Sequence, residues 1–90
     1  MATQGTTTID FGTGKTDVAT AVSASGITGS QLVEAWIFPA ATASNTADNH
    51  WVEDLHVVAG NVQNGVGFTI YAKCNTGKAH GVYNVGYVFN

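Results

Sequence analysis

The sequence predicts an all-β domain, a single antiparallel β-sandwich of about six strands. Short runs rich in β-branched and aromatic residues recur along the chain, and clusters of Gly, Ser, Thr and Asn separate them. Long helix formers are scarce. Gln63-Asn64-Gly65 joins two such runs. Asn-Gly between apolar runs is the strongest short-range hairpin signal, because a type I′ turn needs positive φ at both central positions.

Three strands are predicted before that hairpin. Thr6–Phe11 and Thr16–Ser23 each alternate between two faces with a period of two residues, the pattern of a half-buried strand. The second segment also spaces two valines by four residues, so a short helical turn near 16–24 stays open as an alternative. Leu32–Phe38 is almost continuously apolar and ends at Pro39, which is typical of a central strand covered on both faces.

The hairpin and the C-terminal segment supply the remaining strands. The hairpin arms are Trp51–Val62 and Val66–Lys73, and Gly60-Asn61 near the turn can form a bulge. Gly81–Asn90 alternates cleanly between the two faces of a last strand. We expect that strand and Leu32–Phe38 to cover the apolar face of the hairpin, formed by Leu55, Val57, Phe68 and Ile70.

The chain forms one domain, because no linker or internal repeat divides it. We expect the sandwich to span residues 6–90, after a polar arm, Met1–Gly5, that is flexible or bound to a partner. A small-residue polar loop, Ala40–Asn49, precedes the hairpin and is long enough to make contacts of its own.

The composition is poor in charge. Charged residues make up 10% of the chain and apolar residues 44%, whereas about a quarter of a soluble chain is usually charged. Such a surface indicates burial in an assembly, or a stable all-β module with a Thr/Ser/Asn surface. Three lysines, no arginine and a net charge of −3 argue against nucleic-acid binding.

Other features of the sequence indicate the compartment in which the protein is made. No run approaches the roughly 18 apolar residues of a membrane span, and the N-terminus lacks the charged and apolar regions of a signal peptide. We therefore expect synthesis in the cytoplasm and no membrane partner. The single cysteine, Cys74, excludes an internal disulfide framework.

The sequence contains no convincing catalytic or cofactor motif, and we expect a protein that is not an enzyme. Gly12–Thr16 matches only the end of a phosphate-binding loop, because Ile9 occupies the position of its first glycine. Four carboxylates, Glu34, Asp48, Glu53 and Asp54, could in principle form an acid/base pair, but so small a sandwich has little material for a sugar cleft.

The histidines and the cysteine raise the question of a metal site. Their spacings, His50-x₅-His56 and Cys74-x₅-His80, lack the tight pairs that zinc sites favour, so we predict no metal. A three-fold symmetric assembly could still bring copies of one histidine together on its axis.

Several polar or exposed positions have no intramolecular role in the predicted sandwich. Glu34 lies inside an apolar strand, where it faces solvent, hydrogen-bonds a neighbouring segment, or pairs with a lysine or backbone amides of another subunit. The outward face of the second hairpin arm and the segment around the long loop likewise have no intramolecular role. The candidate partner interface therefore comprises Glu34, Asn45, Asp48, His50, Thr69, Tyr71 and Lys73.

From about Thr8 to the C-terminus, the chain resembles small stand-alone proteins encoded among the virion structural genes of tailed bacteriophages. The segments that carry the resemblance are L-V-E-A-W (32–36), H-W-V-E (50–53), A-G-N-V (59–62), G-F-T-I-Y (67–71) and Y-V-F-N (87–90). More distantly, Ala59–Ala72 and the closing strand are similar to an H-type lectin domain, a six-stranded sandwich that trimerises. No recognisable sugar-binding set stands at matched positions.

The resemblance implies a location in the virion and a homo-oligomer, with a trimer favoured. The expected function is that of a capsid decoration (cement) protein that stabilises the head by binding the major capsid protein. The alternative is a lectin-like tail-fibre or tail-tip module that binds host-surface glycan or another tail protein.

Overall fold

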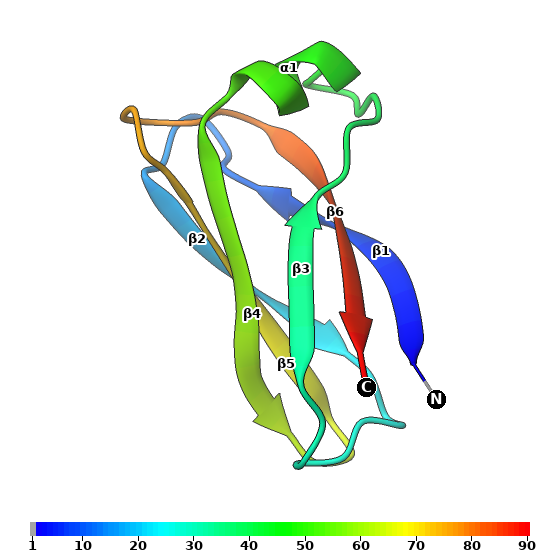
Figure 1. Cartoon of the computed structure of the whole chain (residues 1–90). Coiled ribbons are helices and arrows are strands. Elements are labelled where there is room, and N and C mark those ends of the chain that lie inside the picture. Colours follow the sequence, from blue (N-terminus) through cyan, green and yellow to red (C-terminus); the bar gives the residue numbers. More distant parts are fainter. Residues whose placement is uncertain (1) are drawn as a thin grey trace.

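The computed structural model describes residues 2–90 and consists of two three-stranded antiparallel sheets packed face to face (Figure 1). One sheet has the strand order β1-β6-β3 and the other β2-β5-β4, which confirms the predicted all-β sandwich. The elements are β1 (Thr3–Asp10), β2 (Asp17–Ser23), β3 (Val33–Ile37), α1 (Ala47–Val52), β4 (Leu55–Gln63), β5 (Gly67–Cys74) and β6 (Val82–Phe89).

The core lies between the two sheets and consists of alternate residues of the strands. The buried side chains include Ile9 of β1, Phe68 and Ile70 of β5, and Val85 of β6, while Leu55 and Val57 of β4 pack against them. Edge-to-face aromatic pairs add directional contacts at ring-centroid distances of 5.2 Å for Phe68–Tyr87, 6.0 Å for Phe68–Phe89 and 5.8 Å for Phe11–Tyr83. The predicted core face of the hairpin is confirmed.

The β4–β5 hairpin is present, but its turn is not of type I′. Gly65 has a φ of 72°, whereas Asn64 does not have positive φ, and the Val66 N–H donates to the Gln63 carbonyl over 2.9 Å. A bulge between Gly60 and Gln63 places Asn61 at a φ of 52° instead. The bulge changes the path of β4 before the turn, so that only the glycine of the Asn-Gly pair takes the left-handed conformation.

One prediction near the N-terminus is wrong, and for a second segment the predicted strand is confirmed over its helical alternative. Thr3–Gly5 do not form a separate arm, because they pair with Tyr87–Phe89 and belong to β1; Met1 lies outside the described residues. Residues 17–23 form strand β2 along β5, so the helical alternative near 16–24 is excluded. In both segments a neighbouring strand supplies partners for backbone groups that would otherwise be unpaired.

β3 is an edge strand and not a central strand covered on both faces. It pairs only with β6, and its even-numbered side chains face away from the core. The continuous apolar run from Leu32 to Phe38 therefore reflects an exposed apolar face in addition to a buried one.

The long loop contains a helix that the sequence pattern did not predict. α1 occupies the last part of the predicted loop 40–49 and the start of the predicted hairpin arm, which begins at Leu55 and not at Trp51. The Thr46 hydroxyl accepts the Asn49 N–H over 3.1 Å at the helix N-terminus. Six residues are too few for a helical period to be visible in the sequence.

We predict that Gly67→Ala destabilises the protein by about 2–3 kcal/mol. Gly67 has a φ of 154°, and a Cβ atom there would overlap the Val22 carbonyl oxygen of the adjacent strand. Gly26→Ala is the matched control, since its Cβ would meet no atom within 4 Å, and we expect a change within about 0.5 kcal/mol. Urea denaturation measures both variants, and equal losses would contradict the prediction.

Candidate functional site

The surface exposes an unusual set of large apolar side chains for a chain with so few charges. They lie on the outer faces of the two sheets and at the two ends of the sandwich. The set consists of Leu32, Trp36, Phe38, Trp51, Val52, Val58, Val66 and Tyr71. Where such side chains are contiguous, they are candidate contact surfaces for other macromolecules.

The outer face of the β1-β6-β3 sheet, which we call the tryptophan face, carries two carboxylates and no cation. The ladder continues beyond β3 at both ends: Leu32 and Asn90 exchange hydrogen bonds of 3.1 and 3.0 Å, and the Phe38 N–H donates to the Asn84 carbonyl over 3.0 Å. The side chains of this face are Gln4, Thr6, Thr8 and Asp10 of β1, Val82, Asn84, Gly86 and Val88 of β6, and Leu32, Glu34, Trp36 and Phe38 on and beside β3. Its ionisable groups are Glu34 near one end and Asp10 at the other, where the Asp10 carboxylate accepts the Gly12 N–H over 2.7 Å.

Trp36 forms a flat platform at the centre of the tryptophan face. It stands opposite Gly86 in the ladder, and a Cβ atom on Gly86 would lie 2.5 Å from the indole Nε1 and 2.7 Å from Cε2. Only glycine leaves room for the ring at this position. The indole is 44% exposed, and a shallow groove of about 320 Å³ runs beside it toward Gln4 and Thr6.

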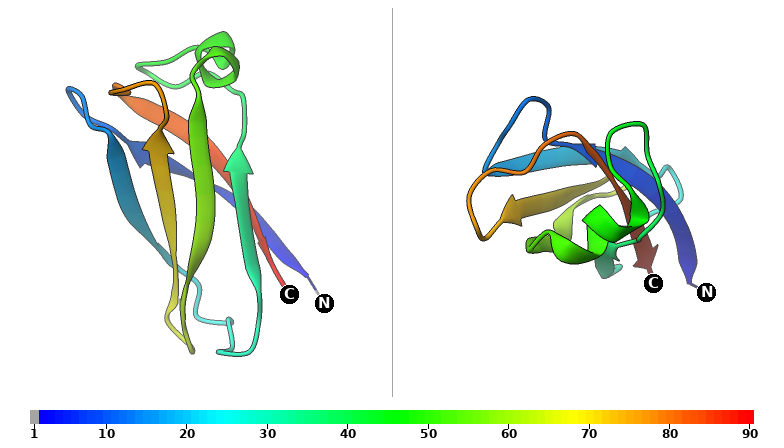
Figure 2. Two further views of the ribbon diagram at one scale, coloured as in Figure 1. Left: turned by 60° about the vertical axis from the view of Figure 1, so that its left-hand side comes forward. Right: turned by 90° about the horizontal axis from the view of Figure 1, so that it is seen from above.

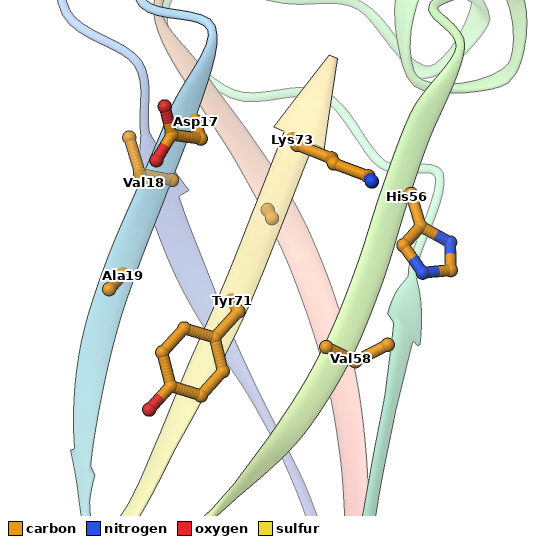
Figure 3. A pocket seen from close by; sticks show the side chains of 8 residues that line it. Asp17, Val18, Ala19, His56, Val58, Tyr71 and Lys73 are labelled. Carbon is orange, nitrogen blue, oxygen red and sulfur yellow. The ribbon is translucent and has the colours of Figure 1, made fainter. Parts of the chain in front are cut away.

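The outer face of the β2-β5-β4 sheet, which we call the tyrosine face, has three rows of side chains. The strand registers place Lys73 between Asp17 and His56, Tyr71 between Ala19 and Val58, and Thr69 between Ala21 and Gly60. A groove of about 380 Å³ covers the first two rows (Figure 3). Small residues on the flanking strands leave the Tyr71 ring 41% exposed.

The charges of the tyrosine face are spread out and not paired. Figure 3 shows the Lys73 ammonium directed toward the β4 side, where His56 lies, whereas Asp17 stands on the other side of β5. Within residues 2–90, Lys73 forms neither an ion pair nor a side-chain hydrogen bond.

The structure separates the seven predicted interface residues into three places. Thr69, Tyr71 and Lys73 share the tyrosine face, and Glu34 lies on the opposite face of the sandwich. Asn45, Asp48 and His50 are at the end of the molecule formed by the long loop and α1 (Figure 2). They do not form one surface.

The long loop has an intramolecular role that the sequence pattern did not reveal. β3 runs antiparallel to β6 and ends opposite Val85, before it reaches the start of β6 at Val82. The first backbone groups of β6 therefore have no strand beside them on that side. Loop side chains take its place: the Val82 N–H donates to Ser44 Oγ over 2.8 Å, and the Val82 carbonyl accepts from Thr42 Oγ1 over 2.8 Å and from Asn45 Nδ2 over 3.0 Å. Asn45 therefore fastens the loop to β6.

His50 is the anchor of this end of the molecule. It is 3% exposed, its Nε2 accepts the Asn84 N–H over 2.8 Å, and its Nδ1 lies 2.7 Å from the Thr46 carbonyl oxygen. Because a carbonyl can only accept, Nδ1 carries the proton and the ring is the neutral Nδ1–H tautomer. The ring also packs edge-on against Tyr83 at a centroid distance of 4.9 Å. His50 is thus a structural residue, enclosed by the domain.

The anchored helix presents two apolar side chains to solvent. Trp51 and Val52 follow His50 directly and are 82% and 78% exposed. Since His50 and the Thr46 cap fix the helix, these two side chains stand at the end of the sandwich on a rigid support. We call this pair the α1 tip.

A partly buried polar cluster lies beneath α1. The Cys74 thiol donates to Glu53 Oε1 over 3.1 Å. Burial raises the pKa of the neighbouring Tyr83 phenol, and the charge of Glu53 acts in the same direction. Within residues 2–90, no three His, Cys, Asp or Glu side chains are grouped closely enough to hold a metal ion.

Sequence reasoning missed the exposed apolar residues of β3. The signal that could have identified them is Glu34, because a carboxylate inside an apolar run marks the solvent-facing side of a strand. Period-two alternation then places Leu32, Trp36 and Phe38 on that same side. Gly86 in the partner strand is a second sign, since glycine inside a strand often marks close approach of another group.

The fold and the surface define a small β-sandwich module with two flat outer faces and one apolar tip, a class suited to contacts with other macromolecules. Comparisons with protein families, curated proteins and solved structures give no match. Within residues 2–90, no helix is long and apolar enough to cross a membrane.

We predict that His50→Ala lowers the free energy of unfolding by about 2–4 kcal/mol. The change leaves the Asn84 N–H and the Thr46 carbonyl without their partner and opens a cavity beside Tyr83. His56→Ala on the exposed outer face is the matched control, with an expected change within about 0.5 kcal/mol. Urea denaturation tests both variants, and a small loss for His50→Ala would refute the anchoring role.

We predict that the stability of the protein falls as the pH rises above about 10, and that Tyr83→Phe makes this fall shallower. The pKa of Tyr83 is raised in the folded state, so the unfolded chain releases this proton first. The contribution is therefore fully present below the unfolded pKa and is lost as the pH rises through the folded value. Denaturation midpoints from pH 8 to 11 compare the two proteins, and parallel profiles would contradict the assignment.

Proposed function

We propose that the protein is a structural component of a bacteriophage virion, a capsid decoration protein that binds the major capsid protein. The resemblance of its β3, hairpin and C-terminal segments to small phage virion proteins supports this function. The structural observation that carries the proposal is the α1 tip, where a tryptophan and a valine are almost fully exposed on a helix anchored by a buried histidine.

The α1 tip has the properties of an interface anchor. Tryptophan is enriched among the residues that dominate binding energy, and rigid presentation reduces the entropy lost on association. Burying such side chains stabilises a complex by about 25 cal/mol per Å² of apolar surface removed from water. A protein that binds only the assembled capsid shifts the equilibrium toward that state by mass action.

The proposal includes a homo-oligomer, with a trimer favoured by the lectin-like resemblance. The low content of charge supports it, because both outer faces can be covered by other subunits while few ionic groups lose their hydration.

A second candidate function is that of a tail-fibre or tail-tip module that binds host-surface glycan. The tyrosine face favours it, since an exposed Tyr71 ring stands beside Lys73, His56 and Asp17 above a shallow groove. An aromatic ring can stack on a sugar while polar neighbours hydrogen-bond its hydroxyls.

Quantitative composition of purified particles separates the two functions. A decoration protein is present at a stoichiometry comparable with that of the major capsid protein, whereas a tail module is present at the much lower stoichiometry of tail proteins. Glycan-array binding by the isolated protein, abolished by Tyr71→Ala, would support the tail function and count against decoration.

We predict that Trp51→Ala reduces binding to particles that lack the protein by about tenfold or more. The change removes the largest apolar side chain of the α1 tip and leaves the His50 anchor in place. Val66→Ala is the matched control, because Val66 is also an exposed apolar residue but lies in the β4–β5 turn, at the opposite end of the sandwich (Figure 1). Particle pull-down across a concentration series measures both variants; equal affinities would exclude the α1 tip as the contact.

A further inference from the structure

We infer that copies of this chain associate through unlike faces, with the tryptophan face of one copy against the tyrosine face of the next and Glu34 opposite Lys73. The inference rests on the homo-oligomer of the proposed function and is independent of binding to the capsid. It leaves the α1 tip outside the contact.

The charges of the two faces are complementary. The tryptophan face carries two carboxylates and no cation: Asp10, which accepts the Gly12 N–H, and Glu34, which has no ionic or hydrogen-bonding partner within residues 2–90. Of the three lysines, Lys73 alone lies on the outer face of a sheet, at the centre of its row, while Lys15 and Lys78 lie outside the named strands. Each face thus carries a charge that needs a partner of the opposite sign when water is removed.

The aromatic side chains match at the same spacing as the charges. Glu34 and Trp36 are two residues apart on one face of β3, and Tyr71 and Lys73 are two residues apart on one face of β5. Two residues of a strand span about 6.6 Å. When β3 of one copy lies antiparallel over β5 of the next, the pair Glu34–Lys73 and the pair Trp36–Tyr71 therefore form together.

The shapes of the two faces are suited to this contact. The Trp36 indole lies flat against the sheet because Gly86 beneath it has no side chain, and alanines and a glycine flank the central strand of the tyrosine face. Two flat aromatic platforms can then meet in the offset geometry that aromatic pairs prefer.

Contacts between like faces are less favourable. Two tryptophan faces would bury two Glu34 carboxylates with no cation between them, which leaves uncompensated charge in a dry interface. Two tyrosine faces could pair Lys73 with Asp17, but Trp36 and Phe38 of both copies would stay exposed to water. Only the unlike pairing covers both apolar faces and neutralises Glu34.

A contact between unlike faces is heterologous, so it generates a closed ring when the rotation between copies permits and an open chain otherwise. Three strands give a face only about 15 Å wide, and we expect a dissociation constant on the order of 10–100 µM. The Glu34–Lys73 pairs make the association weaker at high salt.

The test reverses the charge of Glu34, the charge of Lys73, and both charges together. Sedimentation velocity over a concentration series compares wild type with Glu34→Lys, Lys73→Glu, the double variant, and a mixture of the two single variants. Each single variant places like charges together, and we expect self-association about tenfold weaker or more. The double variant and the mixture restore opposite charges, and we expect association within about threefold of wild type.

Matched controls reverse the same charges away from both faces. Asp48→Lys on α1 and Lys78→Glu in the β5–β6 loop change the net charge equally, and we expect wild-type association. Circular dichroism and thermal melting establish that every variant is folded.

Three results would overturn the inference. The first is a monomeric wild-type protein up to millimolar concentration at low salt. The second is an oligomer that Glu34→Lys and Lys73→Glu leave intact, which would place the contact elsewhere. The third is an association lost in the single variants and not regained in the double variant or the mixture. Sedimentation velocity uses the isolated protein, and the pull-down uses particles. A failure of particle binding is therefore distinguishable from a failure of self-association.

Discussion

The architecture depends on the pairing of every backbone group of β6. Leu32 and Asn90 exchange hydrogen bonds, so the alternation of an antiparallel ladder directs the even-numbered groups of β6 to β3 and the odd-numbered groups to β1. β1 matches β6 over its full length, which draws Thr3–Gly5 into the sheet. β3 is shorter, and in its place Val82 takes a side-chain partner from the long loop and Asn84 takes His50 of α1. The position of α1, and with it the α1 tip, follows from this requirement.

The sequence predicted the fold class, four of the six strands within one residue at each end, and the core face of the hairpin, because period-two alternation reports burial directly. It failed where the deciding partner was distant in the chain. The loop around Asn45 looks like an ordinary polar connection until β6 presents unpaired groups to it. His50 looks like a solvated residue at a strand entry, yet the Asn84 N–H that it accepts is 34 positions away. Long-range hydrogen bonds of this kind leave no periodic trace.

The apolar run of β3 shows why the surface was harder to predict than the core. An apolar residue in a strand is expected to be buried, and a run without alternation therefore indicates cover on both sides. In this chain the second side is exposed, because the sheet has only three strands and no layer lies over its outer face. For the candidate interface the result is mixed: sequence reasoning named Glu34, Tyr71 and Lys73, and it missed Trp36 beside the first of them.

On the side of β3 and β4, the edges of the two sheets are shielded, so the outer faces are the surfaces available for contacts. These two strands lie side by side along a groove of about 400 Å³ lined by Val33, Ala35, Val57 and Ala59 among others. The register of each sheet directs the unpaired N–H and C=O groups of both strands toward this groove. Each strand therefore shields the edge of the other from an incoming chain, and the bulge of β4 and the shortness of β3 discourage pairing further. Side chains that point away from the sandwich have no such protection, which leaves Trp36 and Tyr71 as the large groups that a neighbouring molecule meets first.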